Sequence, residues 1–169
     1  EMVDIFDELR NDEERELIMD KYSNMSIKEI AMKHNINRSL NWLSRADLRP
    51  TKQRIKLAQL LIGDGANKHI TAESLFDLVE KSDVSVSLAT VYNTLKAFCD
   101  VGLINEVMVD GGKSYFDTRL DDHPHFFWED TGQISDAPSE SLEINNLPIA
   151  PDEYEITKVD IIIRLKRSK

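Results

Sequence analysis

The spacing of apolar residues changes abruptly at Gly102, and this change constrains the fold more than any other feature of the sequence. Before Gly102, apolar residues recur every three or four positions, which is the spacing of one face of an α-helix. After Gly102, apolar and polar residues alternate, which is the pattern of a half-buried β-strand. We therefore expect a helical half followed by a strand-rich half, which is an α+β fold.

Capping residues and glycines divide the helical half into segments. Thr51, Thr71 and Ser87 stand where a helix N-cap is expected, and Gly63 ends the helix that Thr51 begins. Asn35 and Asn37 are expected to separate two short helices. The predicted helices cover residues 3–20, 26–34, 38–46, 51–62, 71–81 and 87–98.

Two alternating stretches after Gly102 flank Asp110-Gly111-Gly112, which predicts a β-hairpin over residues 104–118. Further strands are expected over 123–128, near Ile134 and over 156–166, with a proline-containing loop over 138–154. Three helices followed by a hairpin make a winged helix-turn-helix. In this arrangement 71–81 and 87–98 form the helix-turn-helix, and 104–117 form the wing.

The formal net charge of −10 at first argues against binding to nucleic acid. The charges are unevenly distributed, however. Acidic residues concentrate in the last third of the chain and in its N-terminal arm, whereas residues 49–56 contain only basic charges. An acidic total therefore does not exclude a basic surface that binds DNA phosphates.

The helix over 87–98 is the one expected to enter the major groove of DNA. Asn93 can pair with adenine through two hydrogen bonds, and Lys96 can reach phosphate or guanine. The alternative is that Asn93 and Lys96 are merely solvent-exposed and that Tyr92 is a core ring. The candidate DNA-contacting residues are Arg49, Lys52, Arg54, Thr90, Tyr92, Asn93 and Lys96.

Cys99 is the single cysteine, which rules out an internal disulfide and a zinc site built from several cysteines. No apolar run approaches the roughly 20 residues needed to span a bilayer, and no signal-peptide pattern opens the sequence. These features predict a protein of the reducing cytoplasm with no membrane partner.

His123 and His125 stand two positions apart, directly after a run of carboxylates. In an extended strand, positions two apart point to the same face, so both imidazoles can converge on one ligand. The triplet by itself is also compatible with two surface histidines beside acidic residues.

Five separate segments resemble, in order, the ferric uptake regulator (Fur) superfamily. They are LRPTKQRIKLAQLL, HITAESLFDLV, SVSLATVYNTLKAF, GLINEVMVDGGKSYFDT and HPHFF. The resemblance looks closest to the iron response regulators (Irr) of alphaproteobacteria. It is carried by the segment VSLATVYNTL, by YFDT at the end of the wing, and by NNLPIAP and VDIIIRLKR near the end of the sequence. The resemblance covers about residues 40–166.

The resemblance implies a homodimeric transcription factor with an N-terminal winged helix and a small C-terminal α/β dimerisation domain. It implies double-stranded DNA as partner, with an A/T-rich palindromic operator. The expected domains are a helical extension of unclear role over 1–38, a winged-helix DNA-binding domain over 39–118 and a dimerisation domain over 119–169. The strand over 156–166, with apolar residues Val159, Ile161, Ile163 and Leu165, is expected to belong to the dimer sheet.

The family places a metal site in the hinge between the two domains, and its ligands fall on His69, Asp117, His123 and His125. A histidine–carboxylate set without thiolate suits Mn(II), Fe(II) or Zn(II), and His123 and His125 can also bind haem iron. The implied function is control of iron and haem genes by metal or haem at the hinge. The alternative is a manganese- or zinc-sensing repressor of the same fold.

Several positions depart from the family's pattern. Trp128 and Thr131 occupy the places of a Cys-x-x-Cys zinc clip, so no structural zinc is expected. Pro124 stands where iron response regulators commonly have a further histidine. A second metal site of the family would use the positions of Asp122, Pro124, Glu143 and Val159. Only Asp122 and Glu143 can coordinate an ion, so this second site is expected to be lost.

An enzyme is not expected, because the sequence lacks a metal-plus-base constellation such as H-E-x-x-H. A pure protein-interaction module would leave the basic stretch and Asn93 unexplained. The segment SIKEIAMKHNINRSL resembles a helix-turn-helix motif, but such short patterns are common. His34 within it is interpreted as structural.

Overall fold

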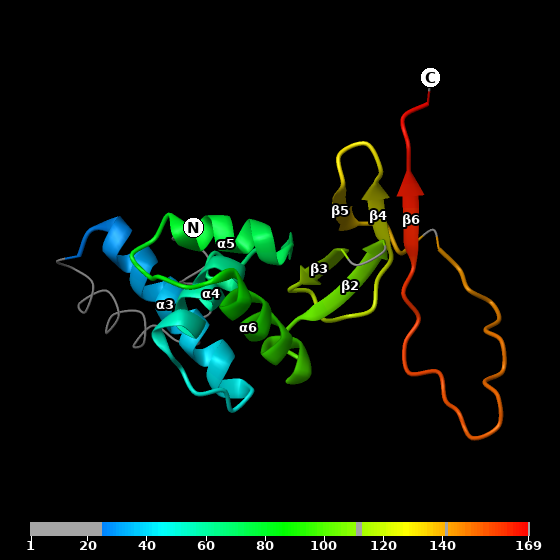
Figure 1. The fold of residues 1–169 in the computed structure, drawn as a ribbon, viewed down its shortest axis with the longest axis horizontal. Helices are drawn as coiled ribbons and strands as arrows, with labels where there is room; N and C mark the ends of the chain where they lie inside the picture. Colours follow the sequence, from blue (N-terminus) through cyan, green and yellow to red (C-terminus); the bar gives the residue numbers. More distant parts are fainter. Residues whose placement is uncertain (1–24, 111–112, 141, 169) are drawn as a thin grey trace, which may run out of the picture.

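The computed structural model describes residues 25–110, 113–140 and 142–168, so the helix predicted over 3–20 lies outside the described residues. The helices are α3 (Ile27–Arg45), α4 (Lys52–Ile62), α5 (Ala72–Glu80) and α6 (Leu88–Asp100). The strands are β1 (His69–Ile70), β2 (Asn105–Asp110), β3 (Lys113–Asp117), β4 (His125–Trp128), β5 (Gln133–Asp136) and β6 (Ile162–Leu165). Figure 1 shows the helices gathered at one end of the molecule and the strands at the other. The predicted change from helices to strands after Gly102 is confirmed.

A single helix, α3, replaces the two short helices predicted over 26–34 and 38–46. Ser26 and Glu29 form a capping box at its start. Asn35 does not interrupt the helix, because an asparagine costs a helix interior less than about 1 kcal/mol, and buried Leu43 anchors the second half in the core. The segment SIKEIAMKHNINRSL is therefore one continuous helix, and α3 runs across residue 38, where the N-terminal extension was expected to end.

Helices α4, α5 and α6 begin at the predicted caps. The side chains of Thr51, Thr71 and Ser87 each accept a hydrogen bond from the backbone N–H three residues later, which satisfies a donor of the first turn. The apolar faces of the helices meet in one core. Its fully buried side chains include Leu43, Leu57, Leu61, Leu75, Val79, Val91, Leu95 and Phe98. This core fixes α5 against α6 in a helix-turn-helix. None of the described helices has the length and apolar character to cross a membrane.

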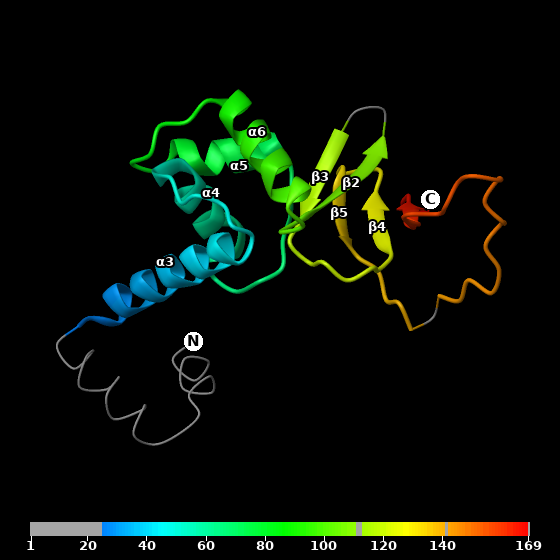
Figure 2. The same ribbon diagram turned by 90° about the horizontal axis from the view of Figure 1, so that it is seen from below.

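Two three-stranded sheets make up the other end of the molecule (Figure 2). The first has the order β1-β3-β2, and its β2–β3 hairpin is the predicted wing. The second has the order β5-β4-β6, with β4 antiparallel to β5 and parallel to β6. A second, smaller core joins the two sheets and contains Val107, Val109, Tyr115 and Phe127, with Ile134 and Ile162 packed against it. The wing is therefore packed against the second sheet.

The described residues after the wing contain strands and no helix, which corrects the α/β prediction for this domain. Residues 142–161, which include Pro148 and Pro151, have irregular structure. The strand predicted over 156–166 is also shorter, because β6 covers only Ile162–Leu165. Its one neighbour, β4, is itself four residues long, so the chain before β6 has little strand to pair with.

Candidate metal centre

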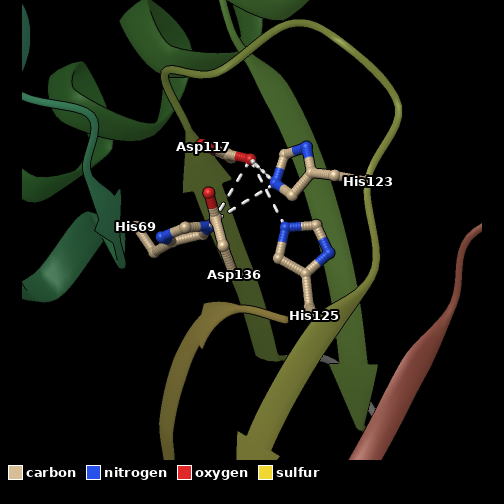
Figure 3. A group of neighbouring side chains, drawn as sticks. All are labelled: His69, Asp117, His123, His125 and Asp136. Atoms are coloured by element: carbon tan, nitrogen blue, oxygen red, sulfur yellow. Dashed lines mark hydrogen bonds and ion pairs between the residues drawn. The ribbon is translucent and has the colours of Figure 1, made fainter. Parts of the chain in front are cut away.

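Five side chains that carry metal-binding atoms point toward one another where the two sheets meet (Figure 3). They are His69, Asp117, His123, His125 and Asp136. One ligand atom from each lies within 4.8 Å of all the others. Donor atoms bound to one ion at about 2.0–2.2 Å lie at most about 4.4 Å apart, so the group needs to contract only slightly to hold an ion.

Strand pairing brings these residues together from distant parts of the chain. His69 in β1 lies opposite Asp117 at the end of β3. In the second sheet, His125 at the start of β4 lies opposite Asp136 at the end of β5. His123 precedes β4 by two residues and points into the same group (Figure 3). Each sheet therefore contributes candidate ligands to one site between the two sheets.

Three atoms of this group that could bind a metal are buried and have no hydrogen-bond partner among the described residues. They are Nε2 of His69, Nε2 of His123 and Oδ1 of Asp136. Asp136 Oδ1 lies 3.0 Å from His69 Nε2 and 3.1 Å from His123 Nε2, yet the geometry does not meet that of a hydrogen bond. Because buried polar atoms are rarely left unpaired, their convergence on one point indicates a site built for a cation.

Contacts outside the group determine which atom of His123, Asp117 and Asp136 faces the centre. His123 Nδ1 lies 2.7 Å from the carbonyl oxygen of Asp121, and a hydrogen bond there leaves the lone pair on Nε2. The backbone N–H of Arg119 donates to Asp117 Oδ1 at 2.8 Å, and its guanidinium donates to Asp136 Oδ2 at 2.8 Å. Each carboxylate therefore keeps its other oxygen for the centre.

Asp117 remains a carboxylate although its side chain is only 1% exposed. Burial by itself raises the pKa of a carboxyl group. The hydrogen bond from His125, the nearby His69 imidazole 3.4 Å away and the backbone N–H of Arg119 outweigh the burial and hold the pKa of Asp117 well below its ordinary value. A buried carboxylate needs a compensating cation, which a divalent ion supplies.

Replacing Arg119 by glutamine should weaken metal binding without removing a ligand. The substitution removes the guanidinium that holds Asp136 and leaves the backbone N–H that holds Asp117. Partners of this kind typically contribute about 10–100-fold to metal affinity, so we expect the Kd for Mn(II) to rise by about that factor. The matched control is Arg167→Gln, because Arg167 is 89% exposed and pairs with Asp130. Equal Mn(II) affinities in the two variants would contradict this role of Arg119.

The structure brings together all four residues that the sequence predicted for this site, and it adds two that the sequence analysis missed. Asp136 supplies a fifth ligand atom, and Arg119 holds the two carboxylates. The signal for Asp136 was its place at the end of the strand near Ile134. Antiparallel pairing of that strand with the one that begins at His125 puts Asp136 beside the histidine pair.

The predicted DNA-contacting residues lie on α6, on the beginning of α4 and just before it. Arg49, Lys52, Asn93 and Lys96 are exposed, and Arg54 and Thr90 are half-buried. Gln53 donates to the carbonyl oxygen of Ser85 at 3.4 Å, and Lys56 lies 3.5 Å from Asp83. The basic beginning of α4 therefore lies beside the loop that leads into α6.

Tyr92 is 43% exposed, so its interpretation as a core ring is wrong. Its hydroxyl donates to Glu73 in the first turn of α5 at 2.5 Å. The contact holds the Tyr92 ring on the outer surface of the helix-turn-helix, where it remains available to a partner.

Comparison with known proteins places the chain in a family. The pattern of the ferric uptake regulator family matches residues 45–164. The peroxide-responsive repressor PerR of Staphylococcus aureus (strain Mu50) is 29% identical over 134 residues, which cover 79% of this chain and 89% of the relative. The ferric uptake regulator of Pseudomonas aeruginosa, solved with manganese, has a TM-score of 0.54 and 25% identity, covering 76% of this chain and 98% of that one. The Vibrio cholerae regulator shares the fold at a TM-score of 0.54 and 23% identity, covering 73% and 95%.

This protein therefore belongs to the ferric uptake regulator family. Members of the family are metal-responsive regulators of transcription and not enzymes, and they bind DNA as dimers. The family resemblance drawn from the sequence is confirmed at this level, together with a mixed fold of helices and sheets.

Proposed function

We propose that the protein regulates iron and haem genes as a dimer whose affinity for DNA is set by a divalent metal at the hinge. The observation that carries the proposal is the convergence of unpaired, buried donor atoms between the two sheets. Three imidazole nitrogens and two carboxylate oxygens, without thiolate, suit Mn(II), Fe(II) or Zn(II). The residues that would hold the ion are His69, Asp117, His123, His125 and Asp136.

Charge balance supports a divalent ion. With neutral imidazoles, the carboxylates of Asp117 and Asp136 carry two negative charges, which a 2+ ion compensates in a largely buried site. The 25% identical regulator of Pseudomonas aeruginosa was solved with manganese, so Mn(II) is the first ion to test.

The position of the site gives the ion a way to control DNA binding. His69 and Asp117 belong to the sheet that includes the wing, whereas His125 and Asp136 belong to the second sheet. An ion bound by both pairs fixes the angle between the two parts of each subunit. In a dimer, that angle sets the separation of the two α6 helices, which must match half-sites about one helical turn of DNA apart.

Haem is the other ligand to which the resemblance to the iron response regulators points, with His123 and His125 as candidate ligands. Their ring centroids lie 4.4 Å apart, and their side chains are 2% and 7% exposed. The cavity beside them has a volume of about 10 Å³, which is far too small for a porphyrin. Haem therefore requires the sheets to separate, and we propose that it competes with the ion and releases DNA.

A peroxide-responsive repressor is the second candidate function, and the 29% identity to the Staphylococcus aureus peroxide-responsive repressor favours it. The two candidates differ in what changes the DNA affinity of the metal-loaded protein. Loss of DNA binding after hydrogen peroxide, in Fe(II)-loaded but not Mn(II)-loaded protein, would favour peroxide sensing.

The outer face of the second sheet is the part that we propose to form the dimer. Ile162 packs on the core shared with the wing, and Arg164 lies over the Phe127 ring, 5.4 Å from its centroid. Because side chains alternate along a strand, the opposite face of β6 points away from the wing. Ile163 and Leu165 lie on that face of β6, and Val159 and Ile161 precede the strand. These four residues are the apolar set predicted from the sequence.

Replacing Ile163 by aspartate should convert the protein from dimer to monomer. The carboxylate would stand on the proposed contact face, in register with Phe126 of β4, where dimerisation would bury it unpaired. Light scattering at micromolar concentration measures the change. Lys166→Asp is the control, because Lys166 is exposed just beyond β6. A monomeric wild-type protein, or an Ile163→Asp dimer of unchanged stability, would contradict this interface.

The experiment that tests the proposed function measures DNA affinity during titration with Mn(II), Fe(II), Zn(II) and haem. We expect one of the metals to raise affinity for an A/T-rich palindrome by about 5–150-fold, which is the range of typical couplings, and haem to reverse the effect. DNA affinity that none of these ligands alters would refute the proposal.

A further inference from the structure

A second cleft, separate from the metal centre, opens between α3 and the connection from α4 to β1. It has a volume of about 550 Å³, within the range of about 300–1,000 Å³ that is typical of small-molecule sites. Helix α3 supplies one wall, and the other wall consists of Ile62, Gly65, Ala66, Asn67 and Thr118. Figure 2 shows α3 beside α4 in the helical part of the molecule. The cleft shares no residue with the metal centre.

The charge of the cleft favours an anion. Arg38 and Arg45 line it, and no carboxylate does. Within the described part of the chain, neither guanidinium is paired with a carboxylate, in a sequence with 31 acidic and 21 basic residues. Guanidinium groups bind carboxylate and phosphate oxygens through paired hydrogen bonds. The cleft therefore offers two guanidinium groups that no described carboxylate occupies.

Arg38 is held in position for this role. Its Nη2 lies 3.1 Å from His34 Nε2, and its Nη1 donates to the carbonyl oxygen of Gly63 at 3.5 Å. Gly65 has a φ of +79°, and a Cβ atom there would lie 2.2 Å from Arg38 Nη1. Any side chain at position 65 would thus be strained and would displace the guanidinium.

The rest of the wall suits an organic ligand rather than a bare ion. The half-buried Trp42 ring is braced edge-on against Phe98, with 5.0 Å between the ring centroids, and it offers an aromatic surface to the cleft. Asn37, Asn41 and Asn67 add side-chain amides that can donate or accept hydrogen bonds. An aromatic ring and convergent polar groups are two features of small-molecule sites, and the many polar groups here favour a polar ligand.

Thr118, in the wall of the cleft, connects it to the metal centre. Thr118 follows the ligand Asp117, and Lys68 precedes the ligand His69. The backbone N–H of Lys68 donates to the Thr118 hydroxyl at 2.8 Å, and the N–H of Thr118 donates to the carbonyl oxygen of Lys68 at 3.1 Å. A molecule that contacts Thr118 therefore acts on the pair of strands that carries two of the metal ligands.

We propose that this cleft binds a small organic oxyanion with a flat ring, and that the bound anion changes the metal affinity of the hinge. The carboxylate or phosphate lies on Arg38 and Arg45, and the ring lies against Trp42. Binding stands independently of the metal, whereas the effect on the hinge rests on the proposed function.

Fluorescence titration of the full chain tests the binding. In a Trp128→Phe background Trp42 is the single tryptophan, because the sequence has 2. The probes are AMP and phthalate, which carry both ring and oxyanion, and adenosine and inorganic phosphate, which carry one each. We expect saturable binding of AMP or phthalate in metal-free protein, and at least about tenfold weaker binding of the other two. The comparison of AMP with phthalate separates phosphate from carboxylate.

Two variants make the test specific. Arg45→Gln, at an exposed position, should weaken probe binding at least about tenfold, and Arg167→Gln should leave it unchanged. The tighter probe should also change the Mn(II) Kd by about fivefold or more. The absence of saturable binding, or equal binding by Arg45→Gln, would overturn the site. An unchanged Mn(II) Kd in the presence of the probe would overturn the effector role. If no probe bound and Arg45→Gln lost affinity for all DNA sequences alike, the cleft would be assigned to binding of the DNA backbone.

Discussion

A variant that carries both His123→Ala and His125→Ala is expected to bind DNA with an affinity that no longer depends on metal. The two side chains supply the ligand atoms that come from the start of the second sheet, and both lie against Asp117 Oδ2, at 3.1 and 3.4 Å. Loss of a partner that only orients a ligand typically costs about 10–100-fold in metal affinity, so loss of two ligands should cost more than about 100-fold. Calorimetric Mn(II) titration and DNA binding with and without Mn(II) measure the two effects.

The fold and the dimer should survive this double substitution, because neither hydrophobic core contains these histidines. Circular dichroism and light scattering check both properties. His34→Ala, measured without any added organic anion, is the matched control, since His34 lies on α3, outside the group of ligands, and should leave the response to Mn(II) intact. A double variant that still responded fully to metal and haem would refute control through the hinge.

The candidate ligands of the metal centre could be predicted from the sequence to very different degrees. His123 and His125 stand two apart, and a strand turns such a pair to one side, so their proximity could be predicted locally. His69 and Asp117 are 48 positions apart, and only the family resemblance joined them before the pairing of β1 with β3 placed them opposite each other. No local sequence pattern around Asp136 indicated that it lies in the site, because its proximity to His125 depends on the register between β4 and β5.

The fold shows the same division between local and long-range determinants. The caps at Thr51, Thr71 and Ser87 were predicted correctly, because a cap is formed by residues three positions apart. The break predicted near Asn35 was wrong, because packing of Leu43 and the neighbouring Trp42 outweighs a small loss of helix propensity. The length of β6 could not be predicted, since it is set by the length of β4, far away in the sequence.

Replacing Asn93 by alanine is expected to cost about 1–3 kcal/mol of affinity for the operator, or about 5–150-fold, and to relax base preference. Asn93 is exposed on α6, whereas Val91 and Leu95 are buried in the core of the same helix, so the truncation should leave the fold intact. The loss arises because an asparagine side chain can make two hydrogen bonds to adenine, and alanine can make none. Binding to operator and random duplexes, measured over a range of salt concentrations, separates base recognition from phosphate contact.

Lys52→Ala supplies the contrast that makes this prediction specific to α6. Lys52 is exposed at the start of α4, where a phosphate contact is expected to act on all sequences alike. Its replacement should weaken operator and random DNA by the same factor and reduce the slope of log affinity against log salt by about one. Asn93→Ala should instead lower operator affinity with little effect on random DNA. If Asn93→Ala bound both duplexes as the wild-type protein does, α6 would not be the helix that reads the bases.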